Sequence, residues 1–417
     1  MPAQRPRQTL LPRRLLAAAF VAGLALAAAP VQAQDAGFQN YFSGVCQGTP
    51  TGQLATLCGQ TPGGNGGLSS DSQSSLSPSQ VLSGGDTALS RSRGLQEDAR
   101  ERMEDQREAI EEVIGPRFSV FTNLRGEFYE RDRGPGDRER GYEGSTVGVQ
   151  IGGDYRIDNS TLAGIILTYD RSDTDFDADQ PGDGFVPFPN DGGNEEDNYA
   201  LNLYASRTIG DNAYIDGTVG YGYSEYEFAR RVVFQESTRT VATTPVVAEA
   251  DTEGYQLSAG IGAGYDFYRG ALQYGPYVRA TWVRSEIDGY TETDVNNSGL
   301  AVSVDDSTAT SLTSVLGVRA SYSYSTSWGV LVPQGRVEWE HEFRDDARDV
   351  TTRLVQDATN TALTVRTDEP DRDYFNVGAG LLLVLPNGIM PFIDVETLVG
   401  YEDFDRTRVT GGVRLEF

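Results

Sequence analysis

From Pro116 to Phe417, apolar residues alternate with polar residues or glycine in repeated short runs. Leu257 and Ile261 lie on one face of such a run, whereas Ser258 and Gly260 lie on the other. A period of two is the signature of a β-strand, because successive side chains of a strand point to opposite faces. Counting these runs predicts 12 strands, each with an apolar face and a polar or glycine-rich face.

The connections between these strands alternate between short and mostly long. The short connections lie near Ile157–Asn159, Gly210–Asn212, Arg269–Gly270, Ser325–Gly329 and Pro386–Gly388. The long connections cover about Asp132–Gly141, Phe176–Asp197, Ala229–Asp251, Asp288–Ala309 and Arg344–Arg372, and a tight one at Glu402–Asp405 precedes the last strand. Short turns on one rim and long loops on the other are typical of a barrel with lipid outside and water inside.

The predicted fold class is therefore an all-β transmembrane barrel over residues 116–417, with about 12 antiparallel strands. Two of the long loops, Arg230–Asp251 and Val350–Asp368, contain further β-prone stretches. A count two strands higher or lower therefore stays open.

A single amphipathic helix is predicted from Leu95 to Ile114, within a linker over residues 87–115. Its apolar positions form a narrow stripe, nearly all its other residues are charged, and Gly115-Pro116 ends it. Twenty helical residues span about 30 Å, the hydrocarbon thickness of a membrane. One interpretation is an exposed helix or coiled-coil arm. The other, which the following strands favour, is a polar helix that passes through a water-filled pore.

Residues 1–33 read as a signal peptide. Arginines precede an apolar stretch from Leu15 to Ala29, and Val31 and Ala33 mark a small-residue cleavage site that would leave Gln34 at the mature N-terminus. A membrane anchor is the alternative, but the stretch is short for a span of about 20 residues.

Residues 34–86 form a low-complexity tail that is expected to be disordered, because Gly, Ser, Pro, Gln and Asn dominate from Thr61 to Asp86 and the apolar residues there are isolated. The tail is too short for an independent catalytic domain. It contains the chain's two cysteines, Cys46 and Cys58. In an oxidising export compartment we expect them to form a disulfide, and a metal site is the alternative.

The composition agrees with a barrel and excludes some partners. The chain has 48 Gly, 21 Tyr, 17 Phe and no Lys, and its net charge is −27. Such acidity argues against nucleic acid, whose phosphates must be neutralised by basic side chains. The lumenal set of positions includes arginines that we expect to hold the helix by ion pairs with Glu101, Glu104 and Glu108, while Arg107 pairs with Glu104 along the helix itself. These arginines are Arg279, Arg319, Arg408 and Arg414.

Apart from the metal alternative for the two cysteines, no residue pattern points to a catalytic, cofactor or metal site. His341 is the only histidine, and alternation places it with Trp339 and Phe343 on the lipid-facing side of its strand. An interfacial residue is therefore a better interpretation than a general base. The glycines from Gly260 to Gly264 lie inside a strand, whereas a dinucleotide fingerprint needs a strand before it and a helix after it. We expect these glycines to leave room for the helix.

The C-terminal residues Gly412, Arg414 and Phe417 end an alternating strand with an aromatic side chain. This ending resembles the signal by which outer-membrane barrels are handed to their assembly machinery. Together with the signal peptide, exported tail, helix and 12 strands, it resembles the β-domain of the autotransporter family, the type V secretion route. The resemblance covers about residues 88–417, and only the Gly-x-Arg-x-x-Phe ending is residue-specific.

The resemblance implies a non-enzymatic barrel in the outer membrane that anchors the N-terminal segment and exports it to the cell surface, with the helix in the pore. The expected partners are outer-membrane lipid and lipopolysaccharide and the export and barrel-assembly machinery, with the chain acting as a monomer. The passenger is only about 50 residues, and the helix lacks the Asn that many members use for cleavage, so we expect the tail to stay attached. The alternative is a porin-like diffusion channel with a periplasmic tail.

Overall fold

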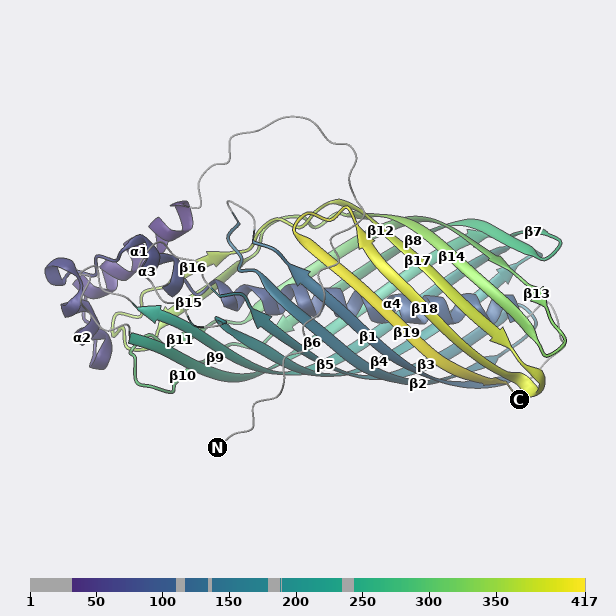
Figure 1. Cartoon of the computed structure of the whole chain (residues 1–417), viewed down its shortest axis with the longest axis horizontal. Coiled ribbons are helices and arrows are strands. Elements are labelled where there is room, and N and C mark those ends of the chain that lie inside the picture. The colour runs from purple at the N-terminus through teal and green to yellow at the C-terminus, as the bar shows by residue number, and fades with distance from the viewer. Residues whose placement is uncertain are drawn as a thin grey trace, which may run out of the picture.

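The computed structural model describes residues 32–109, 117–133, 137–178, 188, 190–234 and 244–416. Among these residues, 12 long antiparallel strands close into a barrel, because β1 pairs with β19 and β6 pairs with β8 (Figure 1). The predicted barrel is thus confirmed. The strands are β1 (Phe118–Arg131), β2 (Tyr142–Arg156), β3 (Thr161–Phe176), β4 (Gly192–Ile209), β5 (Ala213–Phe234), β6 (Thr244–Tyr265), β8 (Leu272–Ile287), β12 (Ser307–Tyr322), β14 (Val330–Glu342), β17 (Asp373–Val384), β18 (Ile389–Val399) and β19 (Phe404–Glu416).

The two rims differ as the spacing of the connections predicts. The short-turn rim carries the short strands β7 (Phe267–Arg269) and β13 (Tyr324–Ser325) and the 3-10 turn η3 (Pro386–Gly388), and β19 ends there. The described parts of the long connections lie at the opposite end of the barrel (Figure 1). No helix within the described residues combines the length and the apolar character that a membrane-spanning helix needs.

The alternating pattern separates an apolar outer face from a polar lumen. On β2, Val147 and Ile151 are 67% and 61% exposed, whereas Gln150 between them is 1% exposed. Exposed apolar side chains on successive outward positions are stable only against lipid, so the outer face of these strands suits a membrane.

The helix α4 (Ser83–Ala109) lies inside the barrel, along its axis (Figure 1). It begins at Ser83, well before the predicted start at Leu95, and the predicted end at Gly115-Pro116 lies outside the described residues. A Cβ at Gly94 would lie 3.1 Å from Nη1 of Arg408, so this glycine lets the wall approach the helix closely.

The tail forms helices, so the expectation of disorder is wrong for its described residues. The elements are α1 (Gln32–Gln47), α2 (Gly52–Gln60), η1 (Pro62–Gly64), α3 (Ser70–Leu76) and η2 (Ser79–Leu82). The physical reason is that apolar residues of the tail, such as Phe42, Val45 and Leu54, are fully buried against the long loops. The tail can fold with few apolar residues, because the loops supply the other apolar side chains of the shared core.

The long loops contribute a small second sheet beyond the barrel rim. Among the described residues its strands are β9 (Tyr290–Thr291), β11 (Val302–Val304), β15 (Asp349–Leu354) and β16 (Leu363–Arg366), while β10 (Thr293–Asp294) pairs with β6. We call this sheet, the tail helices α1–α3 with η1 and η2, and the distal ends of β5 and β6 the cap. The cap lies at the end of the molecule opposite the C-terminus (Figure 1).

Cys46 and Cys58 form a disulfide that joins α1 to α2 within the cap. The expected signal peptide lies outside the described residues as far as Val31. Ala33 and Gln34 fall in the first turn of α1.

We expect the double substitution Cys46→Ser/Cys58→Ser to lower the free energy of unfolding of the cap by about 3 kcal/mol. A disulfide that closes a loop of this size removes conformational entropy from the unfolded chain, which stabilises the folded state by about that free energy. Protease resistance of the cap as a function of temperature measures the effect. The barrel serves as an internal control, since its own unfolding temperature should not move. A cap of unchanged resistance in the double variant would contradict this prediction.

Candidate functional site

The lumen around α4 is the candidate functional site. The helix lies against one side of the barrel wall, formed by β4, β5, β6, β8 and β12. Glycines on this wall make the room. A Cβ at Gly220 would lie 3.0 Å from Nε2 of Gln96, and one at Gly260 would lie 3.2 Å from Oε1 of Gln96. The lumenal glycines therefore form a groove for the helix.

Neutral polar groups fix this side of the helix. Nε2 of Gln96 donates to Ser258 Oγ at 2.7 Å and to Asn202 Oδ1 at 3.2 Å, while Oε1 of Gln96 accepts from Thr218. One turn earlier, the Ser92 hydroxyl donates to Gln256 Oε1 at 3.0 Å. A single glutamine thus joins three strands.

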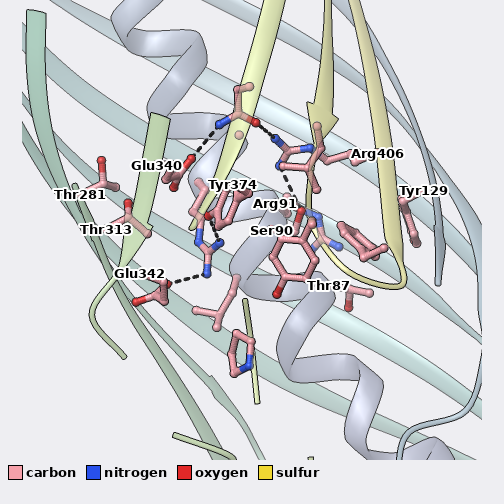
Figure 2. Close-up of a pocket in the computed structure, with 18 of the residues that line it drawn as sticks. Thr87, Ser90, Arg91, Tyr129, Thr281, Thr313, Glu340, Glu342, Tyr374 and Arg406 are labelled. Atoms are coloured by element: carbon pink, nitrogen blue, oxygen red, sulfur yellow. Dashed lines mark hydrogen bonds and ion pairs between the residues drawn. The ribbon is translucent and has the colours of Figure 1, made fainter. Parts of the chain in front are cut away.

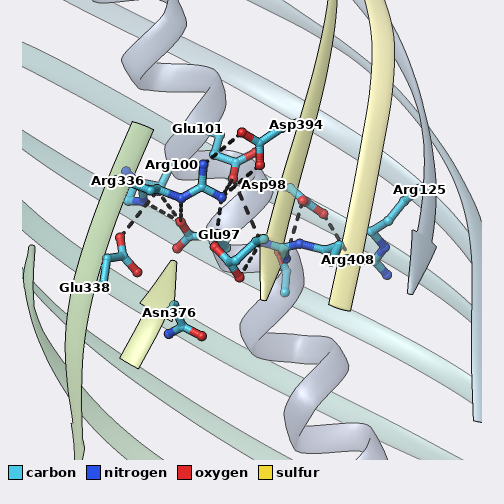
Figure 3. A network of polar contacts seen from close by, with 12 residues as sticks. Glu97, Asp98, Arg100, Glu101, Arg125, Arg336, Glu338, Asn376, Asp394 and Arg408 are labelled. Carbon is cyan, nitrogen blue, oxygen red and sulfur yellow. Dashed lines mark hydrogen bonds and ion pairs between the residues drawn. The ribbon is translucent and has the colours of Figure 1, made fainter. Parts of the chain in front are cut away.

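Charged side chains fix the rest of the helix to the wall (Figure 3). Four acids of the helix contact arginines of the barrel: Glu97–Arg279 2.7 Å, Asp98–Arg125 3.1 Å, Glu101–Arg336 2.5 Å and Glu104–Arg319 2.7 Å. The polarity is reversed for four arginines of the helix, which contact barrel acids: Arg91–Glu196, Arg93–Glu342 3.1 Å, Arg100–Glu338 3.6 Å and Arg102–Asp154. The helix is held from β1, β2, β4, β8, β12 and β14.

These ion pairs fix the position of α4 in the barrel more than they stabilise the folded protein. The side chains of Asp98 and Arg125 are 2% and 1% exposed, so both charges have lost their water. Desolvation offsets much of the attraction in such a pair, but removing one partner leaves a buried charge uncompensated and costs about 3–5 kcal/mol. A shift of the helix by one turn would separate several pairs at once. The network therefore selects one register for α4.

The structure places the predicted lumenal arginines as follows. Arg319 contacts Glu104, as its place in the lumenal set suggests. Arg408 lies 3.9 Å from Glu101 and 3.7 Å from Asp98, and Arg279 contacts Glu97 instead of the three acids named in the sequence analysis. Arg414 is fully buried on β19, with Nη1 3.9 Å from Sδ of Met390. The side chains of Arg107 and Glu108 lie outside the described part of the chain.

Sequence reasoning missed half of the network. Arg91 and Arg93 precede the predicted helix, so their lumenal partners could not be sought. Arg336 was also missed, although it is central to the network: its Nη2 contacts Glu101, Asp394 at 3.0 Å and Glu396 at 2.8 Å. Its position two residues before lumenal Glu338 was the signal that could have identified it.

An acidic group beside Arg336 could be mistaken for a metal site. Carboxylate oxygens of Glu97, Glu101 and Glu396 lie within 4.8 Å of one another. Arg336 and Arg408 lie among them, with Arg408 Nη2 3.2 Å from Glu396. The guanidinium groups already supply the positive charge that these acids need.

The lumen beside α4 contains a cavity of about 310 Å³, lined by the helix and by strands β1, β2, β8, β12, β14, β17, β18 and β19. Figure 2 shows Tyr374, Glu340 and Arg406 around it, with Arg91 and Thr87 on the helix. Arg406 donates to Asn376 Oδ1 at 3.2 Å, and Arg93 donates to the Tyr374 hydroxyl at 3.1 Å. The cavity is lined by loop residues such as Asp346 and Arg348 on its long-loop side and reaches Glu97 and Glu396 of the ion network.

The remaining predicted residues lie outside the lumenal contacts. His341 is on the outer face, with Nδ1 2.9 Å from Oδ1 of Asp373 and its ring against Phe343. Gly412 lies where β19 approaches β1, since a Cβ there would be 2.6 Å from the Thr122 carbonyl oxygen. Phe417 lies outside the described residues.

Comparison with known proteins identifies the architecture. The Autotransporter beta-domain family matches residues 120–396. The translocator domain of the autotransporter NalP from Neisseria meningitidis aligns with a TM-score of 0.55 at 14% identity, over 77% of this chain and 98% of that one. This likeness shows the shared fold.

Two curated relatives extend the match. An extracellular serine protease of Serratia marcescens is 24% identical over 59% of this chain and 21% of its own length. The esterase EstA of Pseudomonas aeruginosa is 23% identical over 51% of this chain and 30% of its own length. The chain thus matches less than a third of each of these relatives. The family match and the barrel together show that the chain belongs to the autotransporter β-domain family.

Proposed function

We propose that this outer-membrane translocator carries its own N-terminal tail through the lumen and holds it at the cell surface. The observation that carries the proposal is the path of the chain. It runs from the cap at the long-loop rim, through the lumen as α4, to the short-turn rim where β1 begins. In barrels of this class the short turns face the periplasm and the long loops face outward.

The proposal gives the barrel a transport and anchoring role without catalysis. The protease and esterase names belong to relatives of which this chain spans a fifth to a third. The ion network would fix α4 after export, so that the tail stays joined to the barrel. Assembly would use the alternating C-terminal strand β19, whose pairing with β1 closes the barrel.

A diffusion channel with a periplasmic tail is the second candidate. The cavity of about 310 Å³ beside α4 favours it, because part of the lumen is not filled by the helix. The ion network across the remaining lumen opposes it.

An epitope inserted between Gly64 and Asn65, in an exposed turn of the cap, tests the direction of export. We expect antibody and protease to reach it on intact cells. The matched control is the same epitope after Asp211, in the turn between β4 and β5 at the opposite rim, which should be reached only after the outer membrane is opened. The reverse pattern would place the tail in the periplasm and favour the channel.

A further inference from the structure

We infer that the long loops are a receptor for the tail, and that the helices α1 and α2 would stay bound to the barrel without any covalent connection to it. This inference concerns the contact between two parts of the chain. It holds whichever side of the membrane the cap occupies, so it stands apart from the proposed direction of export.

The core of the cap is divided between two segments that are far apart in the sequence. Phe38, Phe42 and Val45 of α1 and Leu54 and Leu57 of α2 are at most 3% exposed. They pack in one cluster with loop and distal-strand residues that are at most 7% exposed, namely Val232, Phe234, Val246, Leu300, Val302, Val304, Val350, Leu354 and Val365. Each set would face water if the other were removed, so burial of this apolar surface drives their association.

Directional contacts give the association a defined register. The Leu354 amide donates to the Tyr41 hydroxyl at 2.9 Å, and the Thr51 amide donates to the Gln356 carbonyl at 2.8 Å. The Leu54 amide at the start of α2 donates to Oε1 of Gln356 at 3.0 Å. Burial raises the pKa of Tyr41 to about 12, so its hydroxyl stays neutral at this contact through the physiological pH range.

Hydrogen bonds also join α3 of the tail to the barrel, on the β5 side of the rim. The Val233 amide donates to Ser75 Oγ at 3.1 Å, and the Arg140 guanidinium donates to the Ser75 carbonyl at 3.1 Å. Arg140 is itself fixed by Asp191. The receptor surface therefore includes elements that are continuous with the barrel wall.

The charge of the tail fits this role. From Gly37 to Ser70 the sequence contains no Asp, Glu, Lys or Arg, although the whole chain has 61 acidic residues and a net charge of −27. An uncharged segment adds no repulsion to a chain that is acidic as a whole. The ligand class for this receptor is therefore a helical pair with an apolar face, closed by a disulfide and without charged side chains from Gly37 onward.

The test is a cut in the full-length chain. A specific protease site inserted between Gly64 and Asn65 lies in an exposed turn that follows the disulfide, so cleavage frees α1 and α2 as one disulfide-linked piece. The chain is purified in detergent, which makes the cut independent of membrane orientation. After complete cleavage, seen on a denaturing gel, we expect the piece to co-elute with the barrel in size-exclusion chromatography.

The variant Phe42→Ala, cut in the same way, should release the piece roughly a hundredfold faster, because deletion of a buried phenyl group removes several kcal/mol of packing at 1.4 kcal/mol per tenfold. The variant Asn40→Ala changes an exposed residue of the same helix. Its cleaved piece should stay bound to the barrel as the unmodified piece does. Immediate separation of the unmodified piece, or equal release of the Phe42→Ala and Asn40→Ala pieces, would overturn the inference. If the proposed direction of export is wrong, the epitope experiment will show it, and the co-elution of the cleaved piece with the barrel will not change.

Discussion

Replacement of Leu54 by aspartate should unfold the cap while the barrel stays folded. Leu54 is fully buried between α2 and the loops, in a cluster of apolar side chains that a carboxylate would enter without its water. Burial of an unpaired charge costs more than a small domain can offset. On cells or in detergent, we expect protease to digest the tail of this variant at concentrations that leave the unmodified tail intact.

The neighbouring variant Ala55→Asp is the matched control, because Ala55 is exposed on the same helix. It adds the same charge to the same turn of α2 and should keep the protease resistance of the unmodified chain. Equal digestion of the two variants would mean that charge on α2, and not loss of the shared core, exposes the tail. The folded barrel is monitored by its heat-dependent shift in gel mobility.

Replacement of Arg336 by alanine should loosen α4 and open the lumen. This side chain contacts Glu101 of the helix and Asp394 and Glu396 of β18, so its loss leaves three acids close together. Removal of one partner from a buried ion pair costs about 3–5 kcal/mol. We expect channel openings in planar bilayers that the unmodified protein does not show, together with greater sensitivity of cells to large antibiotics.

The variant Arg284→Ala provides the control for this experiment. Arg284 is an exposed arginine of β8 whose partner Glu286 lies on the same strand, so its loss removes a positive charge without affecting the lumen. A closed Arg336→Ala barrel would show that the remaining pairs suffice to hold the helix. Openings in both variants would point to an effect of net charge.

The barrel could be predicted from sequence because each strand carries its own evidence. Val147 and Ile151 on one face and Gln150 on the other identify β2 without reference to any other strand. The alternation of short and long connections then gives the order of the strands and the two rims. Local periodicity and loop length are sufficient for an antiparallel barrel with consecutive neighbours.

The cap could not be predicted in this way, because its evidence is non-local. Phe42 and Leu54 belong to apolar runs too short to form a core by themselves, and their partners Val302 and Leu354 lie more than two hundred residues later. Composition measures only what a segment can bury by itself. The same limit applies to the lumen: alternation predicts which strand positions face inward, but the pairing of Arg279 with Glu97 depends on the rotation of α4 against the wall.

The shared core of the cap has a consequence for how such chains diverge. A substitution that changes the volume of Leu354 or Val302 must be matched by a change in α1 or α2, since neither side can repack alone. Surface loops are usually free to vary, but these loops and the tail should covary in an alignment of close homologues. A chimera that joins the tail of one homologue to the loops of another should lose its cap, although both parents fold.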